Sequence, residues 1–298
     1  MKYTVVIPSY NSKETIGSCL ESIFNSLKRS SIDVEIFVVD SSNDGTSDFV
    51  RKIFPQVNLI RFDKQTYQSR ARNVGARQGR GEYIVFIDSD CVVSEDYFKN
   101  LDEIVKKYGD EYGGFGGKTL NGTPESVVGS VMYFLQFRDF LWDEEVEVKN
   151  IPSTNIIYKR DLFLKEGGFN EELASSEETL FNLNFSEKYR LFFSPSIYVY
   201  HSNRKNLRSF LLHQIKNGYN FQKFKTLFNY GGKLSNTPIL IPLFPIYRFL
   251  RSVKVIFKVI SPIKLIPFSI LFFLGLIFYS LGEISFFFKG DGYDINRL

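Results

Sequence analysis

The first hundred residues alternate between short apolar runs and longer stretches with helical spacing. The apolar runs are rich in Val, Ile and aromatic residues, as expected for strands buried on both faces of a parallel sheet. The stretches between them have polar starts and helical spacing, which predicts helices. The predicted strands are residues 3–7, 35–39, 58–62 and 83–87, and the predicted helices are residues 15–27, 46–53 and 68–78. This order predicts an α/β fold with a mostly parallel, Rossmann-like sheet flanked by helices.

Polar and acidic residues follow three of the predicted strands. Open α/β sheets bind ligands outside the carboxyl ends of their strands, so these residues are candidates for a binding site. They are Pro8, Ser9, Tyr10 and Asn11 after the first strand, Asp40 and Asp44 after the second, and Asp88, Ser89 and Asp90 after the fourth.

Beyond residue 100 the pattern is less regular. Residues 109–117 are rich in glycine and predict a flexible crossing, while residues 127–143 have an aromatic, helical pattern that includes Trp142. Residues 151–158 predict another strand, and residues 175–188 predict a helix with acidic residues at its start.

The C-terminal part has a different composition. Residues 265–282 contain no charged side chain, and Glu283 is followed by another apolar run. A bilayer is crossed by about 20 apolar residues in a helix, so we predict one transmembrane helix over residues 265–288. Glu283 would then reach the membrane interface near the far end. A buried core helix is the alternative.

A basic stripe precedes this span. Arg248, Arg251, Lys254 and Lys258 recur at helical steps among apolar residues, which is typical of an amphipathic helix lying in a membrane interface. With Lys264, five basic residues precede the span, and the positive-inside rule places the N-terminal part in the cytoplasm. The predicted division is a catalytic domain at 1–230, an interfacial segment at 231–264, the transmembrane helix at 265–288 and a short tail at 289–298.

Composition excludes several classes of protein. With 298 residues, 44% of them hydrophobic, the chain has a globular composition, and a formal net charge of +4 gives no indication of nucleic-acid binding. The two cysteines, Cys19 and Cys91, have no metal-binding spacing and imply no disulfide framework. The first apolar run is too short for a signal peptide, so a cytoplasmic catalytic part is expected.

The acidic residues after the fourth strand suggest a metal site. Asp88 and Asp90 would point to the same side if the strand continued, and their charges would repel unless a cation lay between them. Oxygen ligands suit Mg²⁺ or Mn²⁺, and such an ion neutralises a departing diphosphate. The alternative is two solvated aspartates in a turn. For Asp40 we favour a hydrogen bond to a base or ribose, whereas Asp44 is equally well explained as a helix cap.

Four segments, in this order, resemble motifs of the family 2 glycosyltransferases, which have the GT-A fold. They are residues 5–11 (VVIPSYN), 38–46 (VVDSSNDGT), 70–76 (RARNVGA) and 87–90 (IDSD). The resemblance covers about residues 3–220 and implies that Asp40 binds the base, that Arg72 and Asn73 line the donor site, and that Asp90 lies closest to the metal. Ser41 replaces a second aspartate that is common in this family.

The resemblance also implies the general base. Glu177 and Glu178 stand where the family has Glu-Asp before a helix, so Glu178 occupies the position of the base and Glu177 remains the second candidate. A carboxylate there would take the proton of the acceptor hydroxyl in an inverting transfer. The alternative is a first helical turn with acidic capping residues. His201 stands where the family often has a histidine near the metal or diphosphate; the alternative is a structural, hydrogen-bonded histidine.

These features predict a membrane-attached glycosyltransferase that moves one sugar from a nucleotide-diphosphate sugar to a lipid-linked or otherwise membrane-borne acceptor, with Mn²⁺ or Mg²⁺. The Gln-x-x-Arg-Trp motif of processive synthases does not occur, which favours transfer of a single sugar. The expected location is the cell membrane, with one span and the catalytic domain on the cytoplasmic face. Two other functions remain open, a sugar nucleotidyltransferase and a catalytically silent, membrane-anchored binding protein.

Overall fold

The computed structural model describes residues 1–260, 262–290, 293 and 295, without the side chains of residues 258, 259 and 262–264. The chain divides into two compact units, each described by itself below. The first unit comprises residues 1–122 and 140–202, and the second comprises residues 123–139 and 203–298. We call them the sheet unit and the helical unit.

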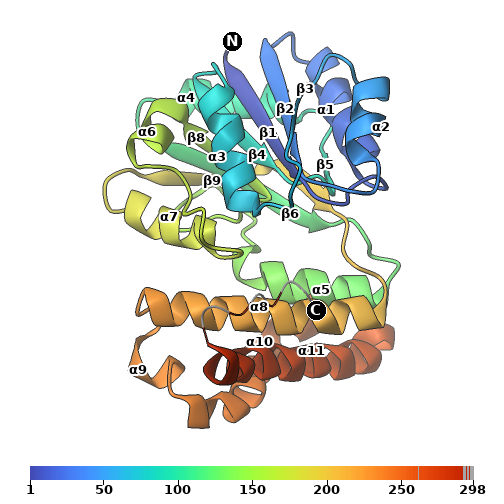
Figure 1. Ribbon diagram of the computed structural model, residues 1–298, viewed down its shortest axis with the longest axis vertical. Helices are drawn as coiled ribbons and strands as arrows, with labels where there is room; N and C mark the ends of the chain where they lie inside the picture. The colour runs from blue at the N-terminus through green and yellow to red at the C-terminus, as the bar shows by residue number, and fades with distance from the viewer. Residues whose placement is uncertain (261, 291–292, 294, 296–298) are drawn as a thin grey trace. The chain divides into compact units, whose positions relative to one another are not determined.

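The sheet unit is built on one nine-stranded sheet (Figure 1). Its strands are β1 (Tyr3–Ser9), β2 (Val34–Asp40), β3 (Asn58–Arg61), β4 (Tyr83–Ile87), β5 (Cys91–Val93), β6 (Gly114–Asn121), β7 (Val146–Val148), β8 (Asn155–Lys159) and β9 (Leu191–His201). The order across the sheet is β3-β2-β1-β4-β8-β6-β9-β5, and β7 pairs with β9 outside this path. The four strands from β3 to β4 are parallel, and β6 is parallel to β9.

Alternating side chains of the central strands fill two hydrophobic cores, one on each face of the sheet. In β4, Tyr83, Val85 and Ile87 belong to one core, and Ile84 and Phe86 belong to the other. Helices cover both faces, which is why these strands read as continuous apolar runs. The helices of this unit are α1 (Ile16–Lys28), α2 (Thr46–Ile53), α3 (Gln68–Gln78), α4 (Tyr97–Tyr108), α6 (Arg160–Lys165) and α7 (Glu177–Phe185).

One glycine fixes the position of α3 against the sheet. A Cβ atom on Gly75 would lie 2.4 Å from Cγ1 of Val6 in β1, which is far inside contact distance. Only glycine lets the helix approach this closely. A Cβ on Gly79 would likewise meet Thr4, so α3 runs opposite to β1 and its N-terminal half lies toward the carboxyl ends of the parallel strands.

The predicted order of strands and helices in the first hundred residues is confirmed. The helices at 46–53 and 68–78 have the predicted bounds, and the α/β architecture is confirmed as well. The sheet is mixed, however, because β8 runs antiparallel to both β4 and β6. The prediction of a mostly parallel sheet holds for the half that the first four strands form.

The predicted flexible crossing at 109–117 is wrong. Residues from Gly114 onward form β6, an interior strand between β8 and β9. Its glycines are required by packing, since a Cβ on Gly116 would lie 2.3 Å from a side-chain carbon of Ile151 and one on Gly117 would lie 1.8 Å from the carbonyl oxygen of Ile197. Glycine here marks close approach of neighbouring chain segments.

Other predicted elements differ only in their ends. The helix expected at 127–143 is α5 (Val127–Phe137), followed by a short 3-10 turn, η1 (Arg138–Phe140). The strand expected at 151–158 begins only at Asn155, and the helix expected at 175–188 is the shorter α7.

The helical unit contains no strand among its described residues. It consists of α5, α8 (Leu207–Leu227), α9 (Gly232–Ser235), the 3-10 helix η2 (Pro238–Leu243), α10 (Phe244–Val259) and α11 (Pro262–Lys289). Two of these, α5 and α8, lie in the range 1–230 that the sequence analysis assigned to the catalytic domain, yet they belong with the C-terminal helices. Segment 265–289 of α11 is long and apolar enough to cross a membrane, judged by length and composition.

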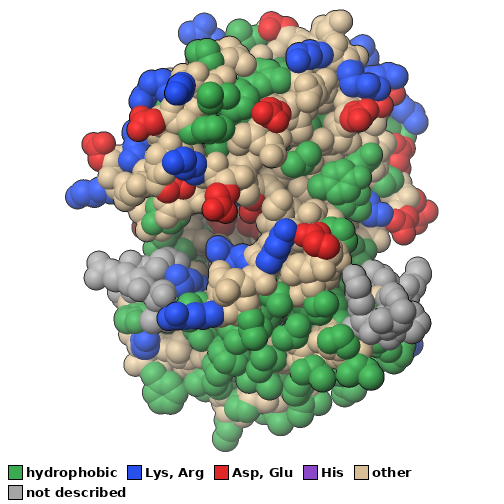
Figure 2. Space-filling model, turned by 90° about the vertical axis from the view of Figure 1, so that its right-hand side faces the viewer, with side chains coloured by type: hydrophobic (Ala, Val, Ile, Leu, Met, Phe, Trp, Pro, Cys, Tyr) green, Lys and Arg blue, Asp and Glu red, His purple; other side chains and the backbone are tan. Residues whose placement is uncertain are grey.

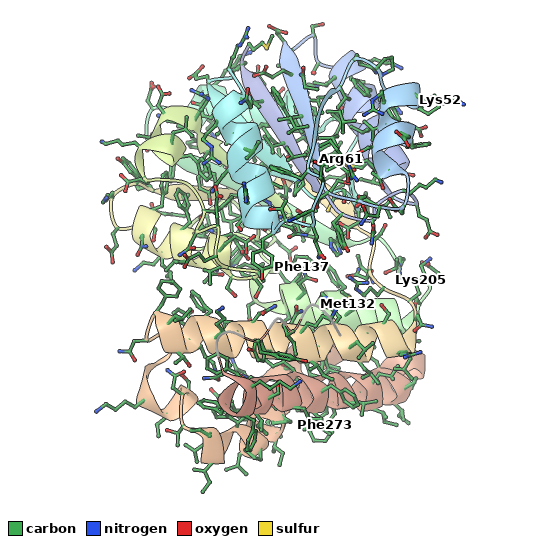
Figure 3. The ribbon with its side chains drawn as sticks, in the orientation of Figure 1. Lys52, Arg61, Met132, Phe137, Lys205 and Phe273 are labelled. Carbon is green, nitrogen blue, oxygen red and sulfur yellow. The ribbon has the colours of Figure 1, made fainter. Side chains whose placement is uncertain are left out.

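α11 packs tightly against α8. A Cβ atom on Gly218 of α8 would lie 1.9 Å from the carbonyl oxygen of Tyr279, and one on Gly282 of α11 would lie 2.1 Å from that of Ile215. The two glycines therefore let the helix backbones touch. Figure 3 marks Phe273 on α11 and Met132 on α5, another helix of this unit.

Glu283 is buried inside the helical unit. Its side chain has no exposed surface and pairs with Lys225 of α8 at 2.8 Å and with Arg248 of α10 at 2.8 Å. The expectation that Glu283 reaches a membrane interface is therefore wrong. Arg248 also departs from the predicted basic stripe because it turns inward to this carboxylate, while Arg251 and Lys254 are exposed. The side chains of Lys258 and Lys264 lie outside the described residues.

Candidate active site

The parallel strands of the sheet unit bring the predicted site residues to one edge. Ser9 at the end of β1 is in register with Asp40 at the end of β2, which in turn is in register with Arg61 of β3. Pro8 is buried within β1, and Tyr10 just beyond it is 42% exposed. Tyr10 is therefore open to solvent at this edge, whereas Pro8 is enclosed in the strand.

Asp40 is buried and has internal partners on both oxygens. Oδ1 accepts hydrogen bonds from the backbone N–H and the hydroxyl of Ser42, and Oδ2 accepts from the hydroxyl of Ser47 and from Arg61 at 3.2 Å. Figure 3 shows Arg61 at the end of β3. A carboxylate saturated in this way orders the loop around it. These contacts hold Asp40 in place, and its contact with a base or ribose stays a prediction.

The loop after β2 is closed by Asp44. One oxygen of Asp44 accepts from the backbone N–H and hydroxyl of Thr46, and the other accepts from the N–H of Lys13 at 3.2 Å. Partial burial works to raise the pKa of Asp44, but these hydrogen bonds outweigh it and hold the pKa below its usual value. This arrangement fits the capping interpretation. Asn11 joins the same loop by donating its N–H to Ser42 at 2.7 Å.

The 88–90 segment lies between the other parts of the site. β4 ends at Ile87, so Asp88 and Asp90 stand in a turn and have different partners. The expectation that both carboxylates point to one side of a continuing strand is therefore not met. Ser89 between them shares a hydrogen bond of 2.7 Å with Ser12, which links this turn to the loop after β1.

Arg72 joins two acidic segments. Its guanidinium is fully buried and donates to Glu177 at 2.6 Å and to Asp88 at 2.5 Å. Burial works to lower the pKa of Arg72, but the two carboxylates outweigh it and raise the pKa. A fixed cation therefore connects the turn after β4 to the start of α7, and its partner Glu177 lies 105 residues further along the chain than Arg72.

Asn73, the next residue of α3, is used inside the protein. Its amide donates to the carbonyl of Phe169 at 2.7 Å and to Glu171 at 3.0 Å, and its oxygen accepts from the N–H of Phe169. Asn73 therefore anchors the loop before α7. The predicted role in lining the donor site is not tested by this placement.

Glu177 and Glu178 have different environments although they are neighbours. Glu177 is 3% exposed and is held by Arg72, while Glu178 is only partly buried and lies outside that ion pair. Burial and the neighbouring charge of Glu177 raise the pKa of Glu178 to about 8. A carboxylate with a pKa near neutrality is suited to take and release a proton.

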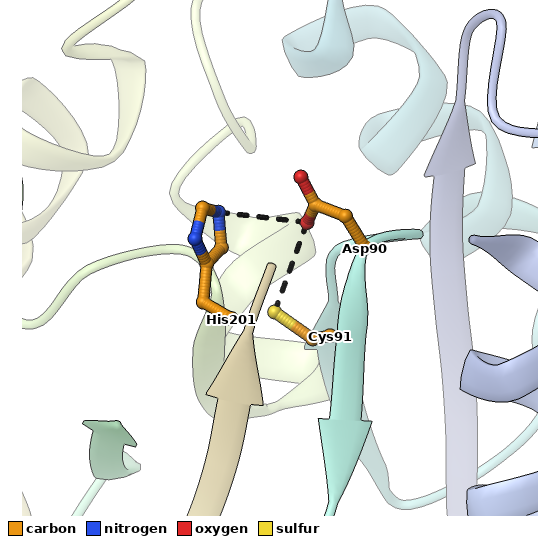
Figure 4. Close-up of side chains that lie close together, drawn as sticks. All are labelled: Asp90, Cys91 and His201. Carbon is orange, nitrogen blue, oxygen red and sulfur yellow. Dashed lines mark hydrogen bonds and ion pairs between the residues drawn. The ribbon is translucent and has the colours of Figure 1, made fainter. Parts of the chain in front are cut away.

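Asp90, Cys91 and His201 form the candidate metal site (Figure 4). Oδ1 of Asp90 lies 3.5 Å from Nε2 of His201, and the potential ligand atoms of the three residues lie within 4.8 Å of one another. Cys91 and His201 are a cross-strand pair of β5 and β9. The carboxylate and imidazole fit a divalent ion such as Mn²⁺, whereas burial raises the pKa of the Cys91 thiol and so disfavours its thiolate. Asp88 lies outside this group because it pairs with Arg72.

Three contributors to the site escaped the sequence analysis. Arg61 holds Asp40, Ser12 holds Ser89, and Cys91 borders the candidate metal site. Arg61 could have been found, since a basic residue at the end of a strand next to Asp40 follows from the predicted sheet. The contacts of Ser12 and Cys91 depend on loop and strand pairings that have no local signature.

The motif order, the mixed sheet and the acidic residues at its edge are those of an α/β protein of the GT-A class. A family model described as Glycosyl transferase family 2 matches residues 4–165. The chain belongs to this family, as its motifs predict.

Several curated glycosyltransferases are similar over part of the chain. Glycosyltransferase AglE of Haloferax volcanii is 25% identical over 58% of this chain and 57% of its own length. Glycosyltransferase EpsJ of Bacillus subtilis is 28% identical over 68% of this chain and 62% of its own length. The poly(ribitol-phosphate) β-N-acetylglucosaminyltransferase TarS of Staphylococcus aureus is 27% identical over 61% of this chain and 32% of its own length. The chain thus spans less than two thirds of each of these relatives.

Solved structures agree on the fold. A mannosyltransferase from Pyrobaculum calidifontis, in complex with GDP-mannose and Mn²⁺, superposes with a TM-score of 0.62 at 16% identity, covering 97% of this chain and 88% of the other. A fragment of TarS in complex with UDP-N-acetylglucosamine superposes with a TM-score of 0.52 at 20% identity, covering 99% of this chain and 93% of the other. At these identities the likeness concerns the fold alone.

Proposed function

We propose that this protein is an inverting glycosyltransferase that transfers one sugar from a nucleotide-diphosphate sugar to a hydroxyl of a membrane-borne acceptor. The observation that supports it most is the Arg72 network, because it brings the turn at 88–90 and the acidic start of α7 together. One segment then contributes a group for the diphosphate and the other a group for the acceptor.

Glu178 is the proposed general base. The acceptor oxygen attacks the anomeric carbon of the donor, its proton passes to the Glu178 carboxylate, and the bond from the anomeric carbon to the diphosphate breaks. Attack opposite to the leaving group inverts the configuration. Glu177 is the weaker candidate, since its ion pair with Arg72 commits it to a positioning role.

Asp90 and His201 are the proposed ligands of a divalent cation. Mn²⁺ or Mg²⁺, when bound there, would neutralise the charge that develops on the departing diphosphate. Asp88 is proposed as a positioning residue, because its ion pair with Arg72 fixes the turn that carries Asp90. Tyr10 and the loops at Asn11 and Asp40 would border the nucleotide, with Asp40 and Asp44 fixing the shape of the loop.

The acceptor is proposed to be lipid-linked or otherwise held at a membrane. The support is the helical unit, which carries a long apolar helix and fifteen Lys and Arg against five Asp and Glu. A basic, apolar unit of this kind favours the cytoplasmic face of the cell membrane. Attachment by a single span is the expectation from the sequence, whereas the packing of the helical unit favours attachment along one side of α10 and α11.

A thermal-shift screen of nucleotide-sugars with and without Mn²⁺ tests the proposal, because a ligand of the folded state raises the melting temperature. We expect one donor to shift the melting temperature only with the metal, and Asp90→Ala to remove that shift. Glu178→Gln should keep the shift but lose transfer by about a thousandfold.

Two other outcomes decide against the proposal. A shift without any transfer or donor hydrolysis, with every acceptor preparation, would indicate a silent binding protein. Release of pyrophosphate from a nucleoside triphosphate and a sugar phosphate would indicate a nucleotidyltransferase. Full turnover in Glu178→Gln would contradict only the assignment of Glu178 as the base.

A further inference from the structure

The helix that is apolar enough to cross a bilayer has charged neighbours at mid-length. Phe249 of α10 packs against Phe272 and Phe273 of α11, so the middle of α10 lies beside the middle of α11. Two residues further along α10, the side chain of Arg251 is 68% exposed and lies 3.9 Å from Asp139, which is 57% exposed. Arg138 lies over the ring of Phe272 at 6.0 Å. Charged groups therefore lie beside this part of α11.

The charged residues of α8 also argue against a bilayer crossing by α11. It contacts α11 from Phe210, next to Gly275, to Lys225, which pairs with Glu283. If α11 crossed a bilayer, α8 would have to cross beside it with Arg208, Lys216 and Lys223 in hydrocarbon. Lys216 lies near the middle of α8, and charged side chains at the bilayer centre are costly and rare. The packing of the helical unit is therefore incompatible with hydrocarbon on all sides of α11.

The exposed apolar side chains of this unit follow one side of each helix. On α11 the most exposed apolar residues, Ile266, Ile270, Leu281 and Phe288, lie on one side of the helix and extend over nearly its whole length, and Phe287 next to Phe288 is exposed as well. On η2 and α10 the exposed side chains are those of Ile239, Leu243, Ile246, Tyr247, Leu250 and Phe257. Figure 2 shows hydrophobic side chains gathered over the surface of the helical unit. These two faces together are called the apolar platform.

Basic side chains stand within and beside the apolar platform. Lys254 is exposed between Leu250 and Phe257 on one face of α10, and Arg251 lies at the side of that face. Long basic side chains in this setting keep their stems among apolar groups and their charged ends at the level of lipid phosphates. The excess of basic over acidic residues in the unit complements an anionic membrane surface.

We propose that the helical unit lies in one leaflet of an anionic membrane, with α10 and α11 parallel to the surface and the apolar platform in the acyl region. This is an interfacial attachment in place of the crossing that the length of α11 allows. It deepens the proposed membrane attachment and is independent of the chemistry assigned to the sheet unit. The interface accommodates the charged neighbours of α11, because only one side of the helix enters hydrocarbon.

The depth of α11 decides between the two arrangements. We would replace Ile266, Leu281 and Phe288 singly by Cys in the full chain, attach the fluorophore NBD, and measure quenching by lipids that carry a quencher at known depths. Unmodified protein is the labelling control, since Cys19 and Cys91 are buried. We expect the same shallow depth at the three positions, and reduction of all three labels by externally added dithionite. A label at Leu281 near the bilayer centre, with one end protected from dithionite, would overturn the proposal.

Vesicle binding tests the surface itself. Cosedimentation with vesicles of phosphatidylcholine and phosphatidylglycerol should be strong, and Leu250→Glu or Phe257→Glu should weaken it about tenfold or more. Arg251→Gln or Lys254→Gln should weaken it about fivefold, with a smaller loss in high salt. Ile53→Glu is the matched control, because Ile53 is a half-exposed apolar residue of the sheet unit, and it should change nothing.

The outcomes separate this inference from the proposed enzyme activity. Protein that stays in the supernatant with every vesicle, while Mn²⁺-dependent donor binding persists, would overturn the membrane proposal and leave the transferase proposal intact. Vesicle binding that the charge-introducing variants do not weaken would also overturn it. Donor binding lost in Asp90→Ala with unchanged vesicle binding is the expected pattern.

Discussion

Each unit of this protein contains a buried ionic network, and the two networks have opposite composition. In the sheet unit a single cation, Arg72, holds the carboxylates of Asp88 and Glu177. In the helical unit a single carboxylate, Glu283, holds the cations of Lys225 and Arg248. The comparison extends to the whole units, since the sheet unit has 22 basic and 28 acidic residues and the helical unit has 15 and 5.

The difference indicates what each network serves. Around Arg72 the excess charge is negative, and Glu178 and Asp90 add to it. Such a region favours the uptake of positive charge, as a bound cation or as a proton. Around Glu283 the excess is positive, and the network joins α8, α10 and α11 within a unit of positive net charge. A buried ion pair contributes little net stability, but breaking one leaves an unpaired charge at high cost. Each network therefore fixes the relative positions of the segments that it joins.

Removing the cation of the sheet unit should have the largest effect. Arg72→Met leaves Asp88 and Glu177 buried without their partner, so we expect a loss of about 3–5 kcal/mol in the free energy of unfolding. Transfer should also fall about a hundredfold or more, because the two acidic segments lose their common anchor. Urea denaturation and turnover of the donor measure the two effects. Arg77→Met on the same helix is the control, since Arg77 is half-exposed and pairs only at the surface. Unchanged turnover in Arg72→Met would remove the network from the mechanism.

Removing the carboxylate of the helical unit should cost stability alone. Glu283→Ala leaves Lys225 and Arg248 buried and unpaired, and we expect a loss of about 3–5 kcal/mol in the free energy of unfolding, with donor binding preserved. Replacing Glu283, Lys225 and Arg248 together by Leu should recover much of this loss, because no unpaired charge remains. If the triple variant is as unstable as Glu283→Ala, the buried charges are not the cause.

The pH dependence of turnover distinguishes Glu178 from Glu177. A base must be ionised to accept a proton, and the pKa of Glu178 is raised to about 8. Turnover should therefore rise with pH up to about 8 and then level off. Glu178→Gln should give low turnover that no longer follows this curve. A wild-type profile that is flat from pH 6 to 9 would contradict the assigned environment.

The free energy of unfolding should fall as the pH rises over the range in which turnover rises, since both follow the ionisation of Glu178. Because the folded-state pKa of Glu178 lies above its unfolded value, the folded protein favours the protonated carboxyl, and this stabilisation is lost as the pH rises through about 8. Glu178→Gln keeps a neutral side chain at every pH. Its melting temperature should match that of the wild type near pH 4 and exceed it by a few degrees at pH 9, measured by calorimetry.

The smallest effect is expected at a surface ion pair. Arg51 and Asp48 lie 2.9 Å apart on α2, but both are well exposed to solvent. Arg51→Ala should change the free energy of unfolding by about 0.5 kcal/mol or less. A larger loss in urea denaturation would show that exposed pairs on this protein are as important as the two buried networks.

Sequence patterns predicted the first half of the sheet unit well because its periodicities are local. Apolar runs, helical spacing and capping residues placed α2 and α3 at their observed bounds. The glycine-rich strand β6 was not predicted, because its glycines are required by close contacts with Ile151 and Ile197, which lie far along the chain. For the site, the strand ends located Asp40, Asp88 and Asp90 at one edge.

The roles of individual side chains depended on distant partners. The oxygens of Asp40 accept hydrogen bonds from Ser42, Ser47 and Arg61, while its predicted contact with a base or ribose stays a prediction. Asp88 pairs with Arg72, a contact that the sequence did not indicate, while its predicted place beside a metal with Asp90 stays a prediction. Burial and hydrogen-bond partners decide how a carboxylate acts, and spacing along a strand reports neither.

The sequence by itself determined the order of elements, the family and the location of the ligand edge, because these follow from short-range periodicity and from motifs within single turns. Only the tertiary structure decided that Arg72 joins Asp88 to Glu177 and that Glu283 is enclosed by Lys225 and Arg248. Those partners lie between 16 and 105 residues apart. Bringing them together requires the packed helices and strands, and no local pattern carries that information.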